Sequence, residues 1–198
     1  MLSSDAAQSP DDIPMPAPGH HVFETAFGFC GAGWTSEGLA RFTLPMAEPA
    51  MVTGQITRHL PASQAAEPEG AMADLVDAAR RYFSGSREDF SHVPVDLAGV
   101  DPFRRALYAA MRKLAFGETV TYGGLCARAG FPNAARETGM AMGRNPLPLI
   151  IPCHRVLAAG GRIGGFSAPG GVATKQKMLA LENARSPDAE PAQASFAF

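Results

Sequence analysis

The segment that follows Pro152 holds three residues that could do nucleophilic chemistry together, Cys153, His154 and Arg155. A cysteine attacks as its thiolate, so a reactive cysteine needs a base or a positive charge nearby to lower its pKa. His154 could supply the base and Arg155 the charge. A cysteine that follows the apolar run 149–151 could equally be a small buried core residue, which is the commoner fate of cysteine. The spacing of these residues leaves both interpretations open.

The remaining cysteines and histidines indicate no second reactive centre. Cys30 and Cys126 have no basic neighbour, and Cys126 falls within an expected short helix, where packing is its expected role. Three cysteines without a C-x-x-C pair exclude a disulfide-stapled secreted scaffold and give no zinc signature. The other histidines are scattered, so we expect no metal site; they are His20, His21, His59 and His92.

A helical C-terminal half is expected to position the reactive segment. Asp101-Pro102 combines a capping acid with a proline at the first helical position, which predicts a helix start. Apolar residues at helical spacing then run from Phe103 to Leu114, and Gly117 ends the helix.

Two short helices are expected next, over about 122–129 and 133–143, with Asn133 as the N-cap of the second. Helix, tight turn and helix is the outline of a helix-turn-helix motif, although many helical bundles contain it too. A glycine-rich stretch at 160–165 could form the hairpin of a wing, and a final helix is expected over about 172–182.

The N-terminal half is predicted to be a small α+β unit. Residues 22–44 are rich in Phe, Thr, Gly and Val with turn signals between them, which predicts an antiparallel sheet. Apolar residues at helical spacing predict a helix over 71–83, and 90–97 could add a strand. The expected organisation is a disordered tail (1–19), an α+β lobe (20–99), a second lobe (100–185) and another tail (186–198).

The net charge of −2 hides a strong asymmetry between the halves. Residues 1–100 carry five arginines against thirteen acidic residues, a balance of −8, whereas residues 101–185 carry twelve basic against four acidic residues, a balance of +8. A basic half of this kind favours a polyanionic partner such as nucleic acid. The acidic, proline-rich N-terminus lacks a basic segment, and the apolar runs are too short to cross a bilayer. The sequence therefore predicts a cytoplasmic protein without a membrane segment.

The run from Asn145 to Val156, with its Pro-Cys-His-Arg-Val motif, resembles the active-site signature of the O6-alkylguanine-DNA alkyltransferases, or methylated-DNA–protein-cysteine methyltransferases. The similarity covers about residues 100–185. Flanking segments agree in order and spacing: Thr121-Tyr122-Gly123, Ala134-Ala135-Arg136, Gly164-Gly165-Phe166-Ser167 and Leu181-Glu182.

This resemblance implies repair by direct transfer, with Cys153 attacking the alkyl carbon on O6 of a damaged guanine. The thioether is stable, so each molecule acts once, and no cofactor is needed because the protein is the acceptor. His154 would take the cysteine proton through a bound water, and Glu182 would orient the imidazole. Tyr122 would donate a proton to the leaving base. O6-methylguanine is the implied substrate, and O4-methylthymine a second one.

The resemblance also implies that double-stranded DNA is the partner and that the damaged base is flipped out of the helix. Arg136 would fill the vacated stack, and small neighbours such as Ala135 would let the second helix approach the minor groove. The implied base-binding residues are Asn145, Pro148, Val156 and Ser167.

The implied fold is a ribonuclease-H-like N-terminal lobe followed by a mostly helical, winged-helix-like lobe. We expect a monomer, associated with the nucleoid if the source is prokaryotic. Three features depart from the family pattern: Glu137 stands where a small residue is usual, Phe166 replaces a common tyrosine, and Ala168-Pro169 occupies a place where glycine is frequent.

Three other functions are weighed against repair. A non-catalytic relative would bind alkylguanine and recruit other repair factors, but such relatives lack the cysteine. A winged-helix regulator with a redox- or alkylation-sensing cysteine would bind DNA with sequence specificity. A cysteine hydrolase would turn over, and the basic helical half gives no reason for that activity.

Overall fold

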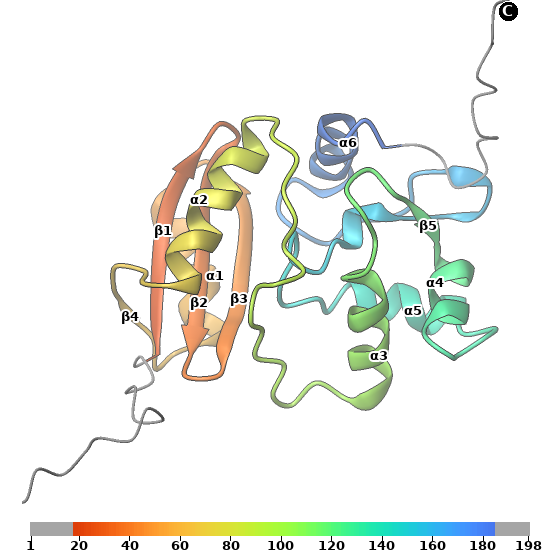
Figure 1. Ribbon diagram of the computed structural model, residues 1–198, viewed down its shortest axis with the longest axis horizontal. Coiled ribbons are helices and arrows are strands. Elements are labelled where there is room, and N and C mark those ends of the chain that lie inside the picture. Colours follow the sequence, from red (N-terminus) through yellow and green to blue (C-terminus); the bar gives the residue numbers. More distant parts are fainter. Residues whose placement is uncertain (1–17, 185–198) are drawn as a thin grey trace, which may run out of the picture.

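The computed structural model describes residues 18–184, and the N-terminal part of this region is built on a four-stranded sheet (Figure 1). Strands β1 (Gly19–Thr25), β2 (Gly28–Thr35) and β3 (Gly38–Met46) form an antiparallel meander. The short β4 (Gln64–Ala65) pairs parallel to β1, which gives the order β3-β2-β1-β4. The predicted antiparallel sheet is thus confirmed, and β3 is left as an edge strand.

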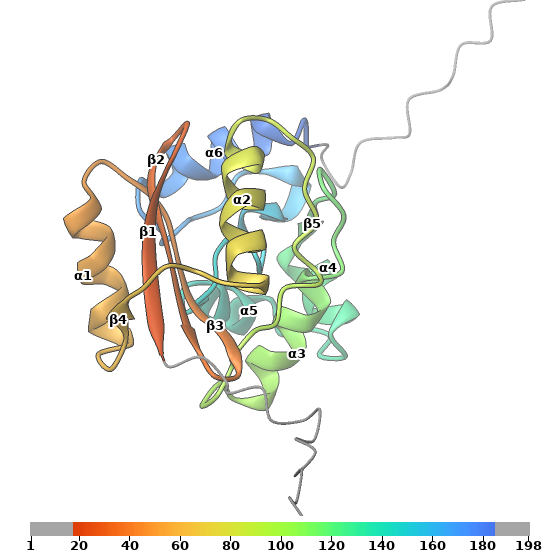
Figure 2. The same cartoon turned by 60° about the vertical axis from the view of Figure 1, so that its left-hand side comes forward.

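Two helices cover opposite faces of this sheet, α1 (Pro49–His59) and α2 (Ala71–Phe83) (Figure 2). The bounds of α2 are those predicted from its apolar spacing. Helix α1 is not among the helices predicted from the sequence, and it packs closely on two glycines of β2. A Cβ at Gly31 would lie 2.5 Å from Val52, and one at Gly33 would lie 2.8 Å from Ile56. These glycines therefore allow α1 to approach the sheet.

The prediction of a strand over 90–97 is wrong. The segment makes only an isolated bridge between Val95 and Leu39 on the edge of β3. Leu39 N donates to the Pro94 carbonyl over 2.9 Å, and Asp96 N donates to the Leu39 carbonyl over 2.8 Å. Pro94 itself has no N–H to donate, so the ladder stops there.

The C-terminal part is mainly helical, as predicted. Asp101 caps α3 by accepting a hydrogen bond of 2.9 Å from Arg104 N, which confirms the predicted helix start. A two-stranded parallel sheet joins the region before α4 to the segment after the reactive cysteine. The elements are α3 (Pro102–Met111), β5 (Val120–Thr121), α4 (Tyr122–Arg128), α5 (Ala135–Met142), the short 3₁₀ helix η1 (Cys153–Arg155), β6 (Val156–Leu157), the short 3₁₀ helix η2 (Ala159–Gly161) and α6 (Gly171–Leu181).

Two details of this half differ from expectation. Asn133 is not the N-cap of α5, because Ala134 takes that position and Asn133 adopts a φ of 72°, a left-handed conformation that asparagine tolerates. The stretch 160–165 forms no hairpin within the described residues. Gly160 and Gly161 both have positive φ, and they close a turn in which Ala158 N donates to the Arg162 carbonyl.

A single hydrophobic core connects the two parts. It includes Cys30 and Leu75 from the sheet region together with Leu107 and Met178 from the helical region. The edge strand β3 also meets the second part directly, since Phe42 N donates to the Pro146 carbonyl over 3.1 Å. The predicted tails lie outside the described residues, apart from Pro18, whose carbonyl accepts from Gln64 N over 3.2 Å, and Gly19, which already belongs to β1. No helix among residues 18–184 is long and apolar enough to cross a membrane.

Candidate active site

Cys153 begins η1 and is buried, with 7% of its surface exposed. The loop before it is braced by one side chain. Asn145 donates from Nδ2 to the Ile151 carbonyl over 2.8 Å and accepts from Leu147 N over 3.0 Å. Leu149 within this loop has a φ of 83°, a strained conformation for a leucine. Asn145 thus braces the turn, and its side chain also interacts with the cysteine thiol.

A pocket of about 330 Å³ opens onto Cys153. Its walls come from the start of α4, from one face of α5 and from the loop before α6. Gly139 of α5 faces the Tyr122 ring, and a Cβ there would lie 3.9 Å from it, an ordinary contact distance. Besides Cys153, the lining residues are Tyr122, Gly139, Met142, Gly143, Gly165, Phe166 and Ser167. The pocket therefore presents one thiol and two hydroxyls on a largely apolar wall.

His154 points away from the pocket and binds Glu182. Its Nε2 lies 2.8 Å from Glu182 Oε1, and both side chains are fully buried. Burial by itself would raise the pKa of Glu182, but hydrogen bonds from His154 and Arg155 hold that pKa well below its ordinary value. An ionised carboxylate can only accept, so Nε2 carries the hydrogen. Nδ1 is then a free acceptor, and it has no hydrogen-bond partner among the described residues.

Burial lowers the pKa of His154 below its ordinary value, although the Glu182 carboxylate acts in the opposite direction. The imidazole is therefore neutral near pH 7. A neutral imidazole held by a carboxylate on one nitrogen, with its other nitrogen unprotonated, is the arrangement of a general base.

Glu182 is the centre of a dense hydrogen-bond network. Arg155 donates to it twice, from Nε over 2.8 Å and from Nη2 over 2.9 Å. Tyr82 donates its hydroxyl over 2.8 Å, and Gly117 N donates over 3.0 Å. The carboxylate is thus fixed by groups from three separate segments, which are η1, the loop after α3 and α2 of the sheet region.

Burial raises the pKa of the Cys153 thiol, while the Asn145 hydrogen bond and the charge of Lys175 act in the opposite direction. Lys175 is buried on α6, and its Nζ donates to the Val156 carbonyl over 2.5 Å. Neither Lys175 nor Tyr82 is among the site residues predicted from the sequence. A lysine at a buried helix position is rare enough to be a signal, whereas nothing in the sequence connects Tyr82 with a carboxylate 100 positions away.

The other predicted residues fall into two groups. Tyr122 and Ser167 line the pocket, and burial raises the pKa of Tyr122, as does the nearby Cys153. Val156 and Pro148 are buried but are not among the residues that line this pocket. Arg136 is exposed near the start of α5 and does not line the pocket either.

Ala135, the small residue beside Arg136, is exposed on α5, as is Glu137, the first of the three residues that differ from the family pattern. Phe166 forms part of the pocket wall. Ala168-Pro169 lies instead along a neighbouring groove.

Comparison with known proteins agrees with this geometry. The family model for the 6-O-methylguanine DNA methyltransferase DNA-binding domain matches residues 102–184. A methylated-DNA–protein-cysteine methyltransferase from Mycobacterium tuberculosis is 40% identical over 118 residues, which span 60% of this chain and 69% of that protein. A Thermus thermophilus protein named DNA base-flipping protein is 40% identical over 119 residues, or 60% of this chain and 78% of that one.

Solved structures match over more of the chain. The crystal structure of the Mycobacterium tuberculosis O6-methylguanine methyltransferase superposes with a TM-score of 0.66 at 29% identity, covering 87% of this chain and 96% of that chain. The Mycobacterium tuberculosis OGT in complex with DNA gives a TM-score of 0.65 at 29% identity over 85% and 94% of the two chains. Fold, reactive segment and relatives agree, and the chain belongs to the methylated-DNA–protein-cysteine methyltransferase family.

Proposed function

We propose that this protein repairs O6-methylguanine in double-stranded DNA by transferring the methyl group irreversibly to its own Cys153, as a single-turnover methylated-DNA–[protein]-cysteine S-methyltransferase. O4-methylthymine is a second substrate. The observation that carries this proposal is the position of Cys153, whose thiol borders a pocket of about 330 Å³ while the His154–Glu182 pair lies behind it. No cofactor is required, because the protein accepts the alkyl group.

The proposed step is a displacement at carbon. Cys153 Sγ forms a bond to the alkyl carbon as the bond from that carbon to O6 of guanine breaks, and guanine leaves with the bonding electron pair. The thiol proton passes through water to His154 Nδ1, and Glu182 stabilises the imidazolium. Tyr122 donates its phenolic proton to the leaving base. The thiol proton ends on His154 and the Tyr122 proton ends on guanine, so the step balances.

Reaching O6 requires the base to leave the duplex, which costs a few kcal/mol of stacking and pairing energy. We assign Arg136 to fill the place that the flipped base leaves in the stack. Ala135 is small and would let α5 approach the minor groove closely. Both are exposed near the start of this helix, which also contributes to the pocket wall. The balance of +8 over residues 101–185 supports attraction to the phosphates.

Ser167 is proposed to contact the polar edge of the base, while Asn145, Pro148 and Val156 shape the loop around Cys153.

The organisation of the chain into two lobes is part of the same proposal. Residues 20–99 form a ribonuclease-H-like lobe and residues 100–185 a winged-helix-like lobe, in which the turn at 160–162 takes the place of a hairpin wing. The protein acts as a monomer in the cytoplasm, at the nucleoid in a prokaryote.

The test is the stoichiometry of transfer. A duplex with radiolabelled O6-methylguanine, added in excess, should label the protein to a plateau of about one methyl group per molecule, because the thioether is not regenerated. Continued turnover would contradict the proposal. Tight binding without label would instead make the protein a base-flipping factor, the function named for the Thermus relative.

A further inference from the structure

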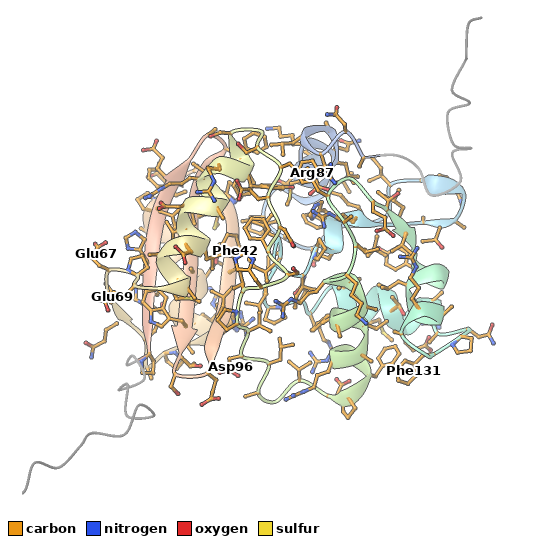
Figure 3. The ribbon with its side chains drawn as sticks, in the orientation of Figure 1. Phe42, Glu67, Glu69, Arg87, Asp96 and Phe131 are labelled. Carbon is orange, nitrogen blue, oxygen red and sulfur yellow. The ribbon has the colours of Figure 1, made fainter. Side chains whose placement is uncertain are left out.

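A second and larger hollow adjoins the pocket on the side of the sheet region. It measures about 830 Å³ and runs from the edge strand β3 and helix α1 to the loop that carries Cys153, which borders both cavities. The Phe42–Pro146 hydrogen bond joins its two walls, and Figure 3 labels Phe42 at this junction. We call this hollow the interlobe groove.

The interlobe groove is lined by three arginines and a histidine, and by no carboxylate among the described residues. Arg41 and His59 come from the sheet region, and Arg104 and Arg144 from the helical region. Arg104 is neutralised by an ion pair with Asp101, which is not a lining residue. Arg41 and Arg144 therefore remain as uncompensated charges.

Arg41 is the most informative of these residues. It is half-buried, and burial lowers its pKa, yet no ion pair to it is found within residues 18–184. Two other arginines of the acidic half are paired: Arg80 with Asp77, and Arg81 with Glu88. A half-buried cation without a counter-charge costs free energy, which an anionic ligand would recover.

The potential in the groove is positive even though the N-terminal half is acidic overall. Burial lowers the pKa of His59, and the charges of Arg41 and Arg58 lower it further. Acidic residues of this half lie elsewhere. Figure 3 shows Glu67 and Glu69 beyond β4, on the side of the sheet away from the helical region.

We propose that the interlobe groove binds the phosphodiester backbone of the DNA strand whose damaged base enters the pocket, with Arg41 and Arg144 as its phosphate contacts. This inference rests on the proposed function, because Cys153 sits where the groove and the pocket meet. It gives the sheet region a direct part in DNA binding. The partner is identified by chemistry: a chain of phosphates matches cations spread along an elongated hollow.

The experiment measures affinity for an undamaged duplex at several salt concentrations, using the full chain. Each phosphate contact contributes about 0.9 to the slope of log affinity against log salt concentration. Arg41→Gln should therefore make the slope shallower by about one, and Arg41→Lys should restore most of it. Arg80→Gln removes the same charge from the same half outside the groove, and should leave the slope as in the wild type.

Equal slopes for Arg41→Gln and Arg80→Gln would overturn the proposal. Calorimetry with inorganic phosphate distinguishes a DNA backbone site from a site for small anions. If Arg41→Gln abolishes phosphate binding but leaves the salt slope of DNA binding unchanged, the groove is a small-anion site, and the proposal is also overturned. Transfer from a free O6-alkylguanine base, which has no backbone, should be equal in wild type and Arg41→Gln. If the wild type transfers nothing even from a duplex that contains O6-methylguanine, the proposed function fails. If it transfers from the duplex and only the slopes of Arg41→Gln and Arg80→Gln agree, the groove assignment alone fails.

Discussion

Cys30 and Cys153 are both buried but differ in their surroundings. Cys30 on β2 is 0% exposed and Cys153 is 7% exposed, and burial raises the pKa of both thiols. Cys30 belongs to the apolar core under α2, with only the hydroxyl of Thr25 acting against the rise. Cys153 has Asn145 and Lys175 acting against it, and a pocket in front. Burial alone makes a thiol inert, so reactivity requires polar neighbours and an opening.

Replacing each cysteine in turn gives the largest expected contrast. Cys153→Ser should abolish methyl transfer, because a serine hydroxyl is a far weaker nucleophile than a thiolate, while duplex affinity stays the same. Cys30→Ala should transfer at the wild-type rate and lose only about 1 kcal/mol of stability from its small cavity. Radiolabel transfer and urea unfolding measure the two effects. Residual transfer by Cys153→Ser would refute the assignment of the nucleophile.

Glu182→Gln should be the next most damaging change. It leaves the buried Arg155 guanidinium without a counter-charge, which typically costs about 3–5 kcal/mol of unfolding free energy. The glutamine oxygen can still accept from His154 Nε2, but it carries no charge to stabilise the imidazolium, so transfer should slow even in the molecules that fold. Glu88→Gln is the matched control, since Glu88 pairs with an exposed arginine, and it should change neither quantity noticeably.

His154→Ala tests whether a general base is part of what makes Cys153 reactive and Cys30 inert. Removing a general base typically slows the reaction by about 10²–10⁴-fold, and raising the pH should recover part of the loss by ionising the thiol directly. Single-turnover rates between pH 6 and 9 provide the measurement, with duplex affinity as the control. A loss of affinity that matches the loss of rate would mean that His154 supports the fold and not the proton transfer.

The pH dependence of stability should show a smaller effect from the same pair. The folded-state pKa of His154 is lowered below 6.5, so protonating it costs stability as the pH falls below that value. The pKa of Glu182 is lowered below 4.5, so the stability that it provides above that pH is lost as the pH falls further. Urea unfolding at pH 7, 5.5 and 4 should show both losses, and His154→Ala should remove the first one. Equal losses in wild type and variant would contradict this reading.

Local patterns in the sequence predicted local structure well. The apolar spacing predicted the bounds of α2 over 71–83, and Asp101-Pro102 predicted the start of α3. The predicted end of α3 at Gly117 is wrong, because the helix ends at Met111. The Pro-Cys-His-Arg-Val motif singled out the residue that borders the pocket. Errors arose where glycine, proline or asparagine conformation decides the outcome, as in the absent strand at 90–97 and at Asn133.

Contacts between distant segments could not be predicted from residue spacing. Tyr82 and Gly117 meet Glu182 only because α2 and the loop after α3 pack against the end of α6. The interlobe groove likewise exists only once β3 lies beside the loop 145–148. Such sites depend on tertiary packing, which the periodicity of apolar residues in the sequence does not predict.

The most direct test of the account is peptide mapping by mass spectrometry after reaction with a duplex that holds one O6-methylguanine. We predict a gain of about one CH₂ group on the peptide that contains Cys153, with the Cys30 and Cys126 peptides unchanged. Methylation of either other cysteine, or an unmodified protein after the lesion has disappeared from the DNA, would contradict the claim that Cys153 is the acceptor.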